Sequence, residues 1–287
     1  MKIWYIRDVP GYERIQYRYC TLAEVFSDHD FRVLYPEDFA SLAGERADVT
    51  FISGRQAASA VWDAGLLDRT GLRIYIPSWR RGGCKEEIHV ARNIKPCVIC
   101  PSQEMYLSEW RKEFDRVHFV DRGFDPQVFC TGSERDKTEY IVFCGNPALG
   151  RLERLELLAG EFPGKVSWKY ELCHAEMADY LRSGRIGWNQ ILRGPPHHTT
   201  GINYRVWEVL GCGVMMLCSF SAHIPLIDGV HCVFWYDDKD MIEKARYYLE
   251  HDDERQRIAE AGHKEAIEKH TWMHRALQYR GIVERYV

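Results

Sequence analysis

Short apolar runs of strand length alternate with helical stretches along most of the chain, and this alternation constrains the fold more than any other feature. In the first part of the chain the apolar runs lie at residues 2–6, 31–35, 48–52, 72–77, 97–100 and 117–120. Between them, residues 15–26 and 105–114 carry apolar side chains at helical spacing. Because strand, helix and strand in this order give a parallel sheet with helices on both faces, the pattern predicts a doubly wound α/β domain.

One segment interrupts the alternation and then a second series begins. Residues 121–140, DRGFDPQVFCTGSERDKTEY, are rich in turn formers and charge, which indicates a linker. After it we expect strands at 140–144, 165–169, 185–191 and 213–217, helices near 149–160, 175–182 and 202–211, and further helices from about 238. A chain of 287 residues suits two such domains. We therefore expect two domains, 1–130 and 131–287, with a cleft between them.

Apolar content and cysteine placement point to a soluble protein. No apolar run approaches the length of about 18 residues that a membrane span requires. The N-terminus turns polar after five residues, so it resembles a first strand more than a secretory signal. The ten cysteines are scattered and mostly lie in apolar runs, which favours reduced, buried thiols over a disulfide framework. We expect a cytoplasmic protein without a membrane span.

The charge of the chain limits what it can bind non-specifically. A net charge of −4 argues against a protein whose main activity is non-specific binding to the phosphates of nucleic acid. Arginines nonetheless gather among aromatic residues at two places in the first domain. Side chains at these two places could contact a large binding partner, nucleic acid included. The alternative is that they form solvated faces beside packed tyrosines. The candidate acceptor-binding residues from these two places are Arg14, Arg18, Trp79, Arg80 and Arg81.

The turn before the helix at 202–211 has the chemistry of an anion site. In an open parallel sheet, ligands lie beyond the carboxyl ends of the strands, where helix N-termini present free N–H groups. Thr199, Thr200 and Gly201 would let a phosphate approach the backbone and the hydroxyl groups. Arg205 and Glu208 share one helix face because they are three residues apart. They suit a diphosphate and the two hydroxyls of a ribose, whereas the alternative is an ordinary exposed salt bridge.

Four segments resemble, in order, parts of a known family. They are VDRGFDPQVF (120–129), YIVFCGNPALGR (140–151), INYRVWEVLGCGVMML (202–217) and the helical stretch 234–275. This series is similar to the group 1 glycosyltransferases of the spore-maturation (CgeB-like) branch, and residues 202–217 resemble that family's R-x-x-E-x-x-x-x-G helix. The likeness covers roughly residues 120–276, and the first 119 residues share only the βα rhythm. It implies the GT-B fold: two Rossmann-like, doubly wound domains facing across a cleft, with C-terminal helices packing back toward the first domain.

The resemblance also implies roles for individual residues. Glu208 would bind the donor ribose, and Arg205 and Arg151 would neutralise the diphosphate of a nucleotide sugar. A loop at Gly145 would lie close under the phosphates, and Tyr170 would lie beside the base. The full set of donor-binding candidates is Gly145, Asn146, Arg151, Tyr170, Leu172, Thr200, Gly201, Asn203, Arg205 and Glu208.

At one position the chain departs from the family. Many group 1 enzymes carry a second glutamate eight positions before the ribose-binding one, and here that position is Thr200. Whatever that glutamate does for the sugar or its reaction centre in those enzymes must therefore be achieved in another way here. Retention and inversion of the anomeric configuration therefore both stay open.

The expected reaction requires charge stabilisation and a proton acceptor. Breaking the bond from sugar to diphosphate leaves negative charge on the leaving oxygen, which arginines and helix N–H groups stabilise without a metal. An inverting enzyme also requires a base for the acceptor proton. Asp8, after the first strand, is the leading candidate, and His198 or its neighbour His197 is the second. The D-x-D and C-x-x-C patterns of the chain are expected to serve as turns, caps and buried strand. No metal or cofactor beyond the nucleotide sugar is therefore expected.

Three hypotheses follow for the function. The first is a glycosyltransferase that uses a nucleotide sugar, with UDP favoured, on a saccharide, protein or small-molecule hydroxyl. The second applies the same donor chemistry to a hydroxymethylated pyrimidine in viral DNA. The third is a non-catalytic module that keeps the fold to bind a nucleotide or a partner.

Overall fold

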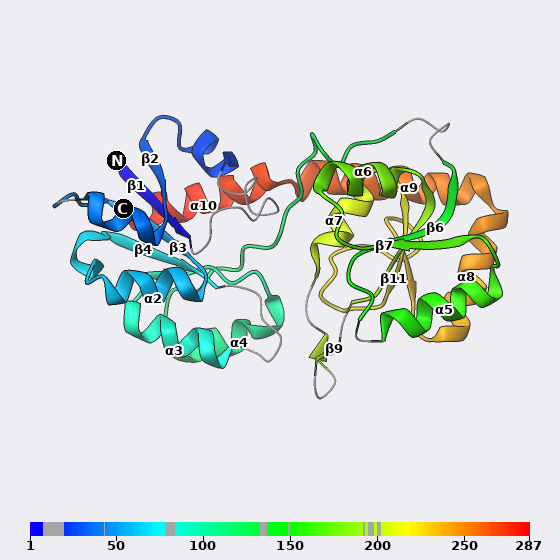
Figure 1. The fold of residues 1–287 in the computed structure, drawn as a ribbon, viewed down its shortest axis with the longest axis horizontal. Coiled ribbons are helices and arrows are strands. Elements are labelled where there is room, and N and C mark those ends of the chain that lie inside the picture. The colour runs from blue at the N-terminus through cyan, green and yellow to red at the C-terminus, as the bar shows by residue number, and fades with distance from the viewer. Residues whose placement is uncertain are drawn as a thin grey trace. The chain divides into compact units, whose positions relative to one another are not determined.

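The computed structural model describes residues 1–7, 20–42, 44–77, 84–132, 137–148, 150–191, 193–194, 198–199 and 202–287. The chain forms two compact units (Figure 1). Unit 1 contains Met1–Arg122 and Trp272–Val287, and unit 2 contains Gly123–Thr271. No helix among these described residues is both long enough and apolar enough to cross a membrane.

Unit 1 is built on one parallel sheet. Its strands are β1 (Lys2–Arg7), β2 (Asp30–Leu34), β3 (Val49–Ser53), β4 (Leu72–Ile76) and β5 (Val98–Ile99). They lie in the order β2-β1-β3-β4-β5, and every neighbouring pair is parallel. The helices include α2 (Arg55–Asp63), α3 (Lys85–Ile94), α4 (Leu107–Glu113) and α10 (Trp272–Tyr286), with 3-10 turns η1 (Pro36–Leu42), η2 (Leu67–Arg69) and η3 (Glu104–Tyr106). Residues 20–25, the described part of the helical stretch predicted at 15–26, are helical as well.

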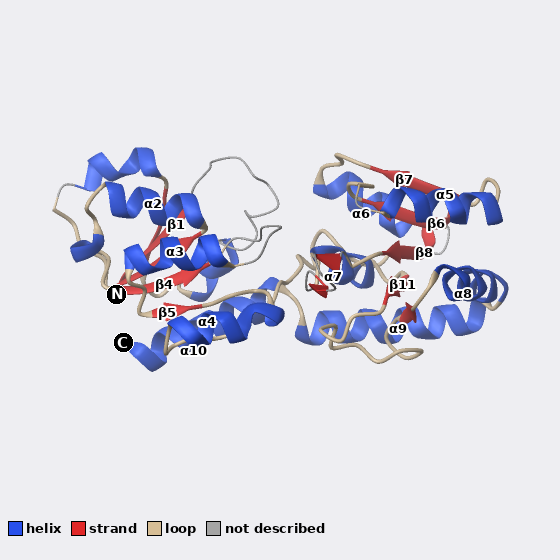
Figure 2. Ribbon diagram, turned by 90° about the horizontal axis from the view of Figure 1, so that it is seen from below, coloured by secondary structure: helices blue, strands red, loops and turns tan. Residues whose placement is uncertain are grey.

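Both faces of the central strands β1 and β3 are buried, which is why these strands are continuous apolar runs, whereas the edge strand β2 is partly exposed. In β1, Ile3 and Tyr5 point to one face while Trp4 and Ile6 point to the other, and none of the four is exposed. Helices α2 and α3 cover the face of Trp4, and α10 covers the opposite face (Figure 2).

Unit 2 repeats the architecture with a second parallel sheet. Its strands are β6 (Glu139–Cys144), β7 (Val166–Lys169), β8 (Gly184–Asn189), β11 (Met215–Ser219) and β12 (Val233–Trp235), in the order β12-β11-β8-β6-β7. Its helices are α5 (Arg151–Glu161), α6 (His174–Arg182), α7 (Tyr204–Gly211), α8 (Asp238–Glu250) and α9 (Asp252–Lys269). A short antiparallel pair, β9 (Arg193–Gly194) and β10 (His198–Thr199), lies between β8 and α7 in the chain.

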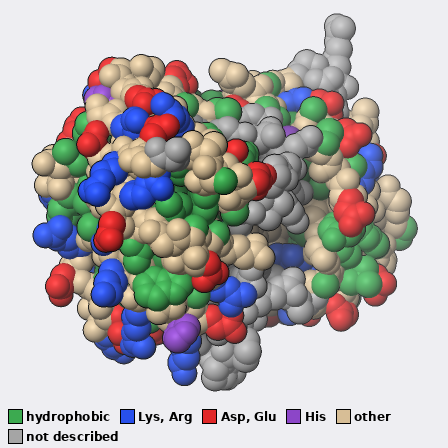
Figure 3. Space-filling view, turned by 60° about the vertical axis from the view of Figure 1, so that its left-hand side comes forward, with side chains coloured by type: hydrophobic (Ala, Val, Ile, Leu, Met, Phe, Trp, Pro, Cys, Tyr) green, Lys and Arg blue, Asp and Glu red, His purple; other side chains and the backbone are tan. Residues whose placement is uncertain are grey.

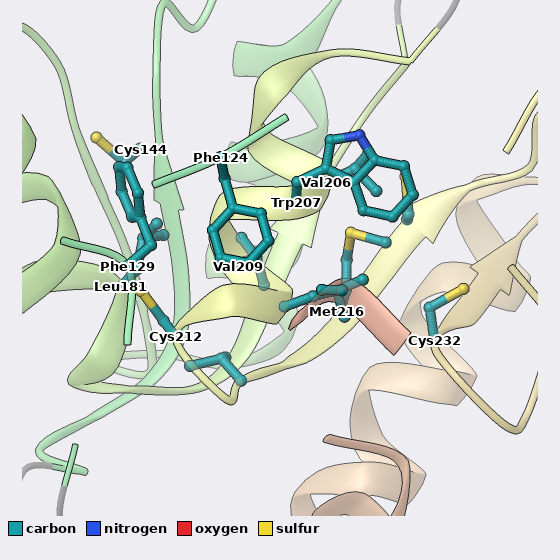
Figure 4. Close-up of a cluster of buried hydrophobic side chains, with 14 of the residues drawn as sticks. Phe124, Phe129, Cys144, Leu181, Val206, Trp207, Val209, Cys212, Met216 and Cys232 are labelled. Atoms are coloured by element: carbon teal, nitrogen blue, oxygen red, sulfur yellow. The ribbon is translucent and has the colours of Figure 1, made fainter. Parts of the chain in front are cut away.

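The helices of unit 2 divide between the two faces of the sheet. Side chains of α5 and α8 pack with one set of strand residues, and those of α6 and α7 pack with the other set. Figure 4 shows the core around α7, where Phe124, Trp207 and Val209 are buried together. A Cβ at Gly211, which ends α7, would lie 2.4 Å from the Phe124 ring. Glycine therefore lets the helix end close to this ring.

Both units thus have the predicted doubly wound α/β architecture.

The last helix belongs to unit 1. Tyr279 of α10 meets Phe51 of β3 edge to face with ring centroids 5.8 Å apart. Arg275 Nε donates a hydrogen bond of 2.9 Å to the carbonyl of Arg122. As the resemblance implied, the C-terminal end packs back on the first unit, although α8 and α9 pack within unit 2. The expected division at 130/131 therefore differs from the compact units, whose boundary follows Arg122 and returns α10 to unit 1.

One predicted strand was wrong, and three short strands, β9, β10 and β12, were missed. Residues 117–120 make a single parallel bridge, from Val117 to Ile99, and do not extend the sheet. They are apolar because Val120 is buried in the core beneath α10. The three residues of β12 are buried and pair only with β11 among the described strands. A strand this short leaves little periodic pattern in the sequence.

Candidate functional site

The sheet of unit 2 has a topological switch point between β6 and β8. These strands are neighbours, but the chain leaves β6 for α5 on one face and leaves β8 for α7 on the other. The loops after the two strands therefore diverge. In open α/β sheets, ligands bind in the crevice that forms at such a point.

The loop after β6 brings backbone close to this point. Gly145 has φ of 149°, a conformation that side chains other than glycine rarely adopt. Its N–H donates to the carbonyl of Lys169 at the end of β7, at 2.9 Å. The side-chain oxygen of Asn146 accepts a 2.9 Å hydrogen bond from the N–H of Ala148, which forms a tight turn. This geometry agrees with a loop that lets a ligand approach the main chain closely.

Arg151 ties the two diverging loops together. Its Nη1 donates to the carbonyl of Asn146 and its Nη2 to the carbonyl of Gln190, each at 3.1 Å. The guanidinium also lies 5.6 Å from the centroid of the Phe143 ring. Arg151 is the first residue of α5, after the left-handed Gly150. A fixed cation and a helix N-terminus thus meet at the switch point, a combination that favours an anionic ligand.

The start of α7 is fixed by two asparagines. Asn203 precedes the helix in an extended conformation, and its side-chain amide pairs with that of Asn189 at 3.3 Å in both directions. Asn189 ends β8 and is completely buried. Its Nδ2 also lies 3.4 Å from the Cys218 sulfur. Burial raises the pKa of the Cys218 thiol to about 12, so the thiol is neutral at physiological pH.

Arg205 and Glu208 form a buried ion pair on α7. Nη1 of Arg205 lies 2.8 Å from Oε2 of Glu208, and the two side chains are 9% and 8% exposed. The same Nη1 lies 2.6 Å from the sulfur of Met177 on α6. The alternative of an ordinary exposed salt bridge is therefore wrong. A pair this enclosed persists because each charge compensates the other.

Two residues expected beside the base have different surroundings. Tyr170 follows β7 and is 51% exposed, with its hydroxyl 3.5 Å from Nδ2 of Asn146. Leu172 is partly buried and packs against the core that contains α6 and α7. Tyr170 is therefore accessible next to the Asn146 loop, whereas Leu172 contributes mainly to packing.

Several predicted residues lie outside the described part of the chain. These are Asp8, Arg14, Arg18, Trp79, Arg80, Arg81, His197, Thr200 and Gly201. The backbone of His198 is described and pairs with Gly194 in the short β9–β10 ladder, but its side chain is not. Their roles in catalysis, acceptor binding and donor binding stay predictions.

Sequence reasoning missed two contributors to the site. Gln190 offers its backbone carbonyl to Arg151, and the Ser219 hydroxyl accepts a 2.8 Å hydrogen bond from the N–H of Ile191. Together with Asn189 they fix the loop after β8 to its neighbours. A signal was available, because polar residues directly after a buried parallel strand mark the carboxyl edge of the sheet. The contact through a main-chain carbonyl carries no such signal.

The D-x-D pattern formed by Asp238, Lys239 and Asp240 has a structural role. Asp237 caps α8 by accepting a 2.8 Å hydrogen bond from the N–H of Asp240. Asp238 pairs with Arg154 at 2.7 Å, and Asp240 pairs with Lys244 at 2.9 Å. Across the described residues, no group of three or more His, Cys, Asp or Glu side chains is placed to hold a metal ion.

Comparisons with known proteins concern the family and the fold of the chain. Residues 143–281 match a family model described as glycosyl transferase-like, and this segment contains Arg151, Arg205 and Glu208. A comparison with curated protein sequences finds no significant match. The match to the family model and the fold described below support a glycosyltransferase enzyme.

Solved structures with low sequence identity share the whole fold. The chain is similar to HepE of Anabaena in complex with UDP and glucose, at a TM-score of 0.73, 11% identity and coverage of 99% of this chain and 100% of that one. It is also similar to sucrose-phosphate synthase from Thermosynechococcus elongatus, at a TM-score of 0.70, 10% identity and coverage of 99% and 98%. An α-glucosyltransferase in complex with UDP-glucose and DNA containing an abasic site matches at a TM-score of 0.68, 10% identity and coverage of 99% of both chains. These likenesses show the GT-B fold.

Proposed function

We propose that the enzyme transfers a sugar from a UDP-sugar to an acceptor hydroxyl, and that the diphosphate of the donor binds at the β6–β8 switch point of unit 2. The observation that carries the proposal is the position of Arg151, which is held by the carbonyls of both diverging loops. It lies inside the segment that matches the glycosyl transferase-like family. A guanidinium fixed in advance does not have to reorganise when charge develops beside it.

The chemistry follows from the charge that the reaction creates. The bond from the anomeric carbon to the diphosphate oxygen breaks, and that oxygen takes the electron pair while the sugar becomes cation-like. Arg151 and the N-terminal N–H groups of α5 stabilise the leaving group, and one such donor is worth about 3–4 kcal/mol. The acceptor hydroxyl attacks the anomeric carbon and gives up its proton. Asp8 and His198 are the proposed bases, and no metal is required by this scheme.

Glu208 is proposed to hold the ribose of the donor. An ionised carboxylate has about four acceptor positions, so the ion pair with Arg205 leaves others for two vicinal hydroxyls. Arg205 orients the carboxylate through the ion pair. In this arrangement the buried pair acts as a unit, with Arg205 also contributing positive charge near the diphosphate.

UDP is favoured over other carriers because structures of the same fold contain it. HepE is described in complex with UDP-glucose, and an α-glucosyltransferase is described in complex with UDP. The order of the four sequence segments further leads us to place the chain in the spore-maturation branch. Buried cysteines without disulfide bonds favour a cytoplasmic location.

Turnover of a donor tests the proposal. Purified protein is incubated with UDP-glucose, other UDP-sugars and GDP-sugars, with and without saccharide acceptors, and released nucleoside diphosphate is measured. We expect release of UDP that an acceptor accelerates. No release from any donor would contradict the proposal and favour the non-catalytic nucleotide-binding module.

A DNA acceptor is the second candidate, because the fold of the α-glucosyltransferase bound to DNA aligns with this chain over 99% of the length of each. On the face drawn in Figure 3, the Lys and Arg side chains of the described residues are interspersed with Asp and Glu. Salt separates the candidates: with DNA containing a hydroxymethylated pyrimidine, activity should fall steeply between about 50 and about 200 mM salt. With a small neutral acceptor it should change little.

A further inference from the structure

Two exposed aromatic side chains lie at the carboxyl ends of the last two strands of unit 2. Phe220 follows β11 and Tyr236 follows β12, and they are 41% and 56% exposed. Their rings stack with centroids 5.1 Å apart and planes inclined by 29°. The N–H of Phe220 donates to the carbonyl of Trp235 at 2.9 Å, which holds the two strand ends together. We call Phe220 and Tyr236 the aromatic platform.

Contacts with neighbouring residues fix the orientation of both platform rings. Phe220 meets the buried Phe234 edge to face, with centroids 5.6 Å apart and planes at 88°. The N–H of Tyr236 donates to Oδ2 of Asp240 at 3.0 Å. Nζ of Lys244 lies 5.1 Å from the centroid of the Tyr236 ring. The rings are therefore oriented before any ligand arrives, which lowers the entropy lost on binding.

A chain of hydrogen bonds connects the platform with the proposed diphosphate site. Arg151 donates to the carbonyl of Gln190, and the next residue, Ile191, donates its N–H to Ser219, which directly precedes Phe220. Phe220 and Tyr236 follow the first and second strands beyond β8, and neighbouring strands are spaced by about 4.8 Å. The order along this edge is thus Tyr170 after β7, Arg151 at the switch point, and then the platform.

The charges around the platform are already compensated. Lys244 pairs with Asp240 at 2.9 Å, Arg154 with Asp238 at 2.7 Å, and Lys239 with Glu243 at 3.7 Å. Among the described residues, these three pairs therefore leave no excess positive charge for a phosphate backbone. An uncharged ring with an apolar face fits better. A pyranose is such a ring, because its C–H groups on one face pack on the electron-rich face of an aromatic side chain.

We propose that Phe220 and Tyr236 bind the hexose ring of the donor. The inference rests on the proposed function, since it takes Arg151 as the ligand of the diphosphate. The hexose is bonded directly to that diphosphate, at the end opposite the nucleoside, so it lies within one ring of the group that Arg151 holds. A saccharide acceptor or a nucleobase on the platform would be alternative occupants, and the test separates them.

Dissociation constants for UDP-glucose and for UDP alone distinguish the hexose from the carrier. They are measured by calorimetry for the wild type, Phe220→Leu and Tyr236→Leu. We expect each variant to bind UDP-glucose about three- to tenfold more weakly and UDP unchanged. Tyr236→Phe keeps the ring and should keep the affinity. Tyr247→Leu is the matched control, because Tyr247 is also an exposed aromatic residue, at 41%. Its ring stacks on that of His251 with centroids 3.8 Å apart, and it lies near the end of α8 and not at the platform.

Each other outcome has a defined meaning. Unchanged affinity for UDP-glucose in both leucine variants overturns the inference, and a slower reaction at low acceptor concentration would then assign the platform to an acceptor ring. Equal weakening of UDP and UDP-glucose also overturns it, because the effect would not depend on the hexose. If the wild type binds neither compound, the proposed function itself fails.

Discussion

Nη1 of Arg205 and Oε2 of Glu208 meet at 2.8 Å inside unit 2, with less than a tenth of either side chain exposed. Their spacing of three residues predicts contact on one helix face, but an exposed pair of this kind contributes only about 0.2–0.5 kcal/mol. Burial changes the energetics, because a charge left alone in the interior lacks both water and a partner. The pair therefore supports the fold as well as the proposed ribose site.

Glu208→Ala should lower the free energy of unfolding by about 3–5 kcal/mol, because it leaves the buried charge of Arg205 without its ion-pair partner. Denaturant unfolding measures the change. Glu268→Ala, which removes a 53% exposed carboxylate paired with Lys264 at 3.9 Å, is the control and should stay within about 0.5 kcal/mol of the wild type. A loss from Glu208→Ala as small as that of the control would contradict the burial argument.

A double variant separates the fold from the donor site. Arg205→Met combined with Glu208→Leu replaces the pair with apolar groups, a change that is often neutral for stability. We expect it to recover most of the stability that Glu208→Ala loses and still to bind no UDP. Binding of UDP by the stable double variant would remove both residues from the proposed site.

The packing of α9 on α7 depends on the absence of a side chain at Gly262. A Cβ there would lie 2.2 Å from the backbone carbonyl oxygen of His231 and 2.8 Å from Leu210. Gly262→Ala should therefore destabilise the protein by roughly 1–3 kcal/mol. Gly281→Ala is the matched control, since a Cβ on this helical glycine meets nothing within 4 Å. It should gain about 0.5–1 kcal/mol in helix propensity, and thermal or denaturant unfolding of both variants tests the contrast.

The thiols divide by accessibility. Cys20, Cys130 and Cys173 are exposed and Cys97 is intermediate, whereas the other six cysteines are buried. Burial raises the pKa of Cys212 and of Cys218 to about 12 each. A thiol reagent at about pH 8 should therefore modify three residues quickly, Cys97 more slowly, and the remaining six only after unfolding. Rapid modification of most thiols in the native protein would contradict the core described here.

His118 gives unit 1 a pH-dependent contribution to stability. Burial, and then the nearby Arg285 and Arg111, lower the pKa of His118 below its ordinary value of 6.5. The unfolded chain therefore takes up this proton at a higher pH than the folded chain. The stability contribution is present above about pH 6.5 and is lost as the pH falls through that value toward the folded pKa.

Unfolding at about pH 7.5 and about pH 5.5 checks the sign of this effect. The wild type should lose more stability between these pH values than His118→Asn, which cannot titrate at this position. Nε2 of His118 lies 2.8 Å from the Tyr286 hydroxyl, so His118→Asn also carries a constant loss that cancels in the pH difference. An equal pH dependence in the two proteins would contradict the assignment.

The sequence predicts the sheets well because both faces of each are covered. Strands such as β4 and β6 are short apolar runs bounded by polar residues, and helices separate them. The prediction for 117–120 was wrong because an apolar segment can be buried beside a helix without pairing in a sheet. The return of α10 to unit 1 depends on contacts such as Tyr279 on Phe51, between residues far apart in the chain, which local patterns do not contain.

The candidate site was predictable where it depends on side-chain type. Gly145 directly follows β6, Arg151 begins α5 and Glu208 lies on α7, and the sequence pattern indicated all three of these elements. The carbonyl of Gln190 and the closeness of Met177 to Arg205 were not predictable, because one is a backbone contact and the other comes from tertiary packing. The burial that distinguishes the Arg205–Glu208 pair from a surface salt bridge depends on the same packing.

Calorimetric titration of UDP into the wild type and into Arg151→Ala tests the central claim most directly. The guanidinium contacts the carbonyls of Asn146 and Gln190, and hydrogen bonds to charged groups contribute about 1.5–3 kcal/mol. We predict one UDP per chain for the wild type and binding weaker by roughly 10- to 100-fold for Arg151→Ala. Arg246→Ala, which removes a half-exposed arginine paired with Glu161 on the surface, should bind as the wild type does. Equal affinity of Arg151→Ala and the wild type for UDP would contradict a diphosphate site at the β6–β8 switch point.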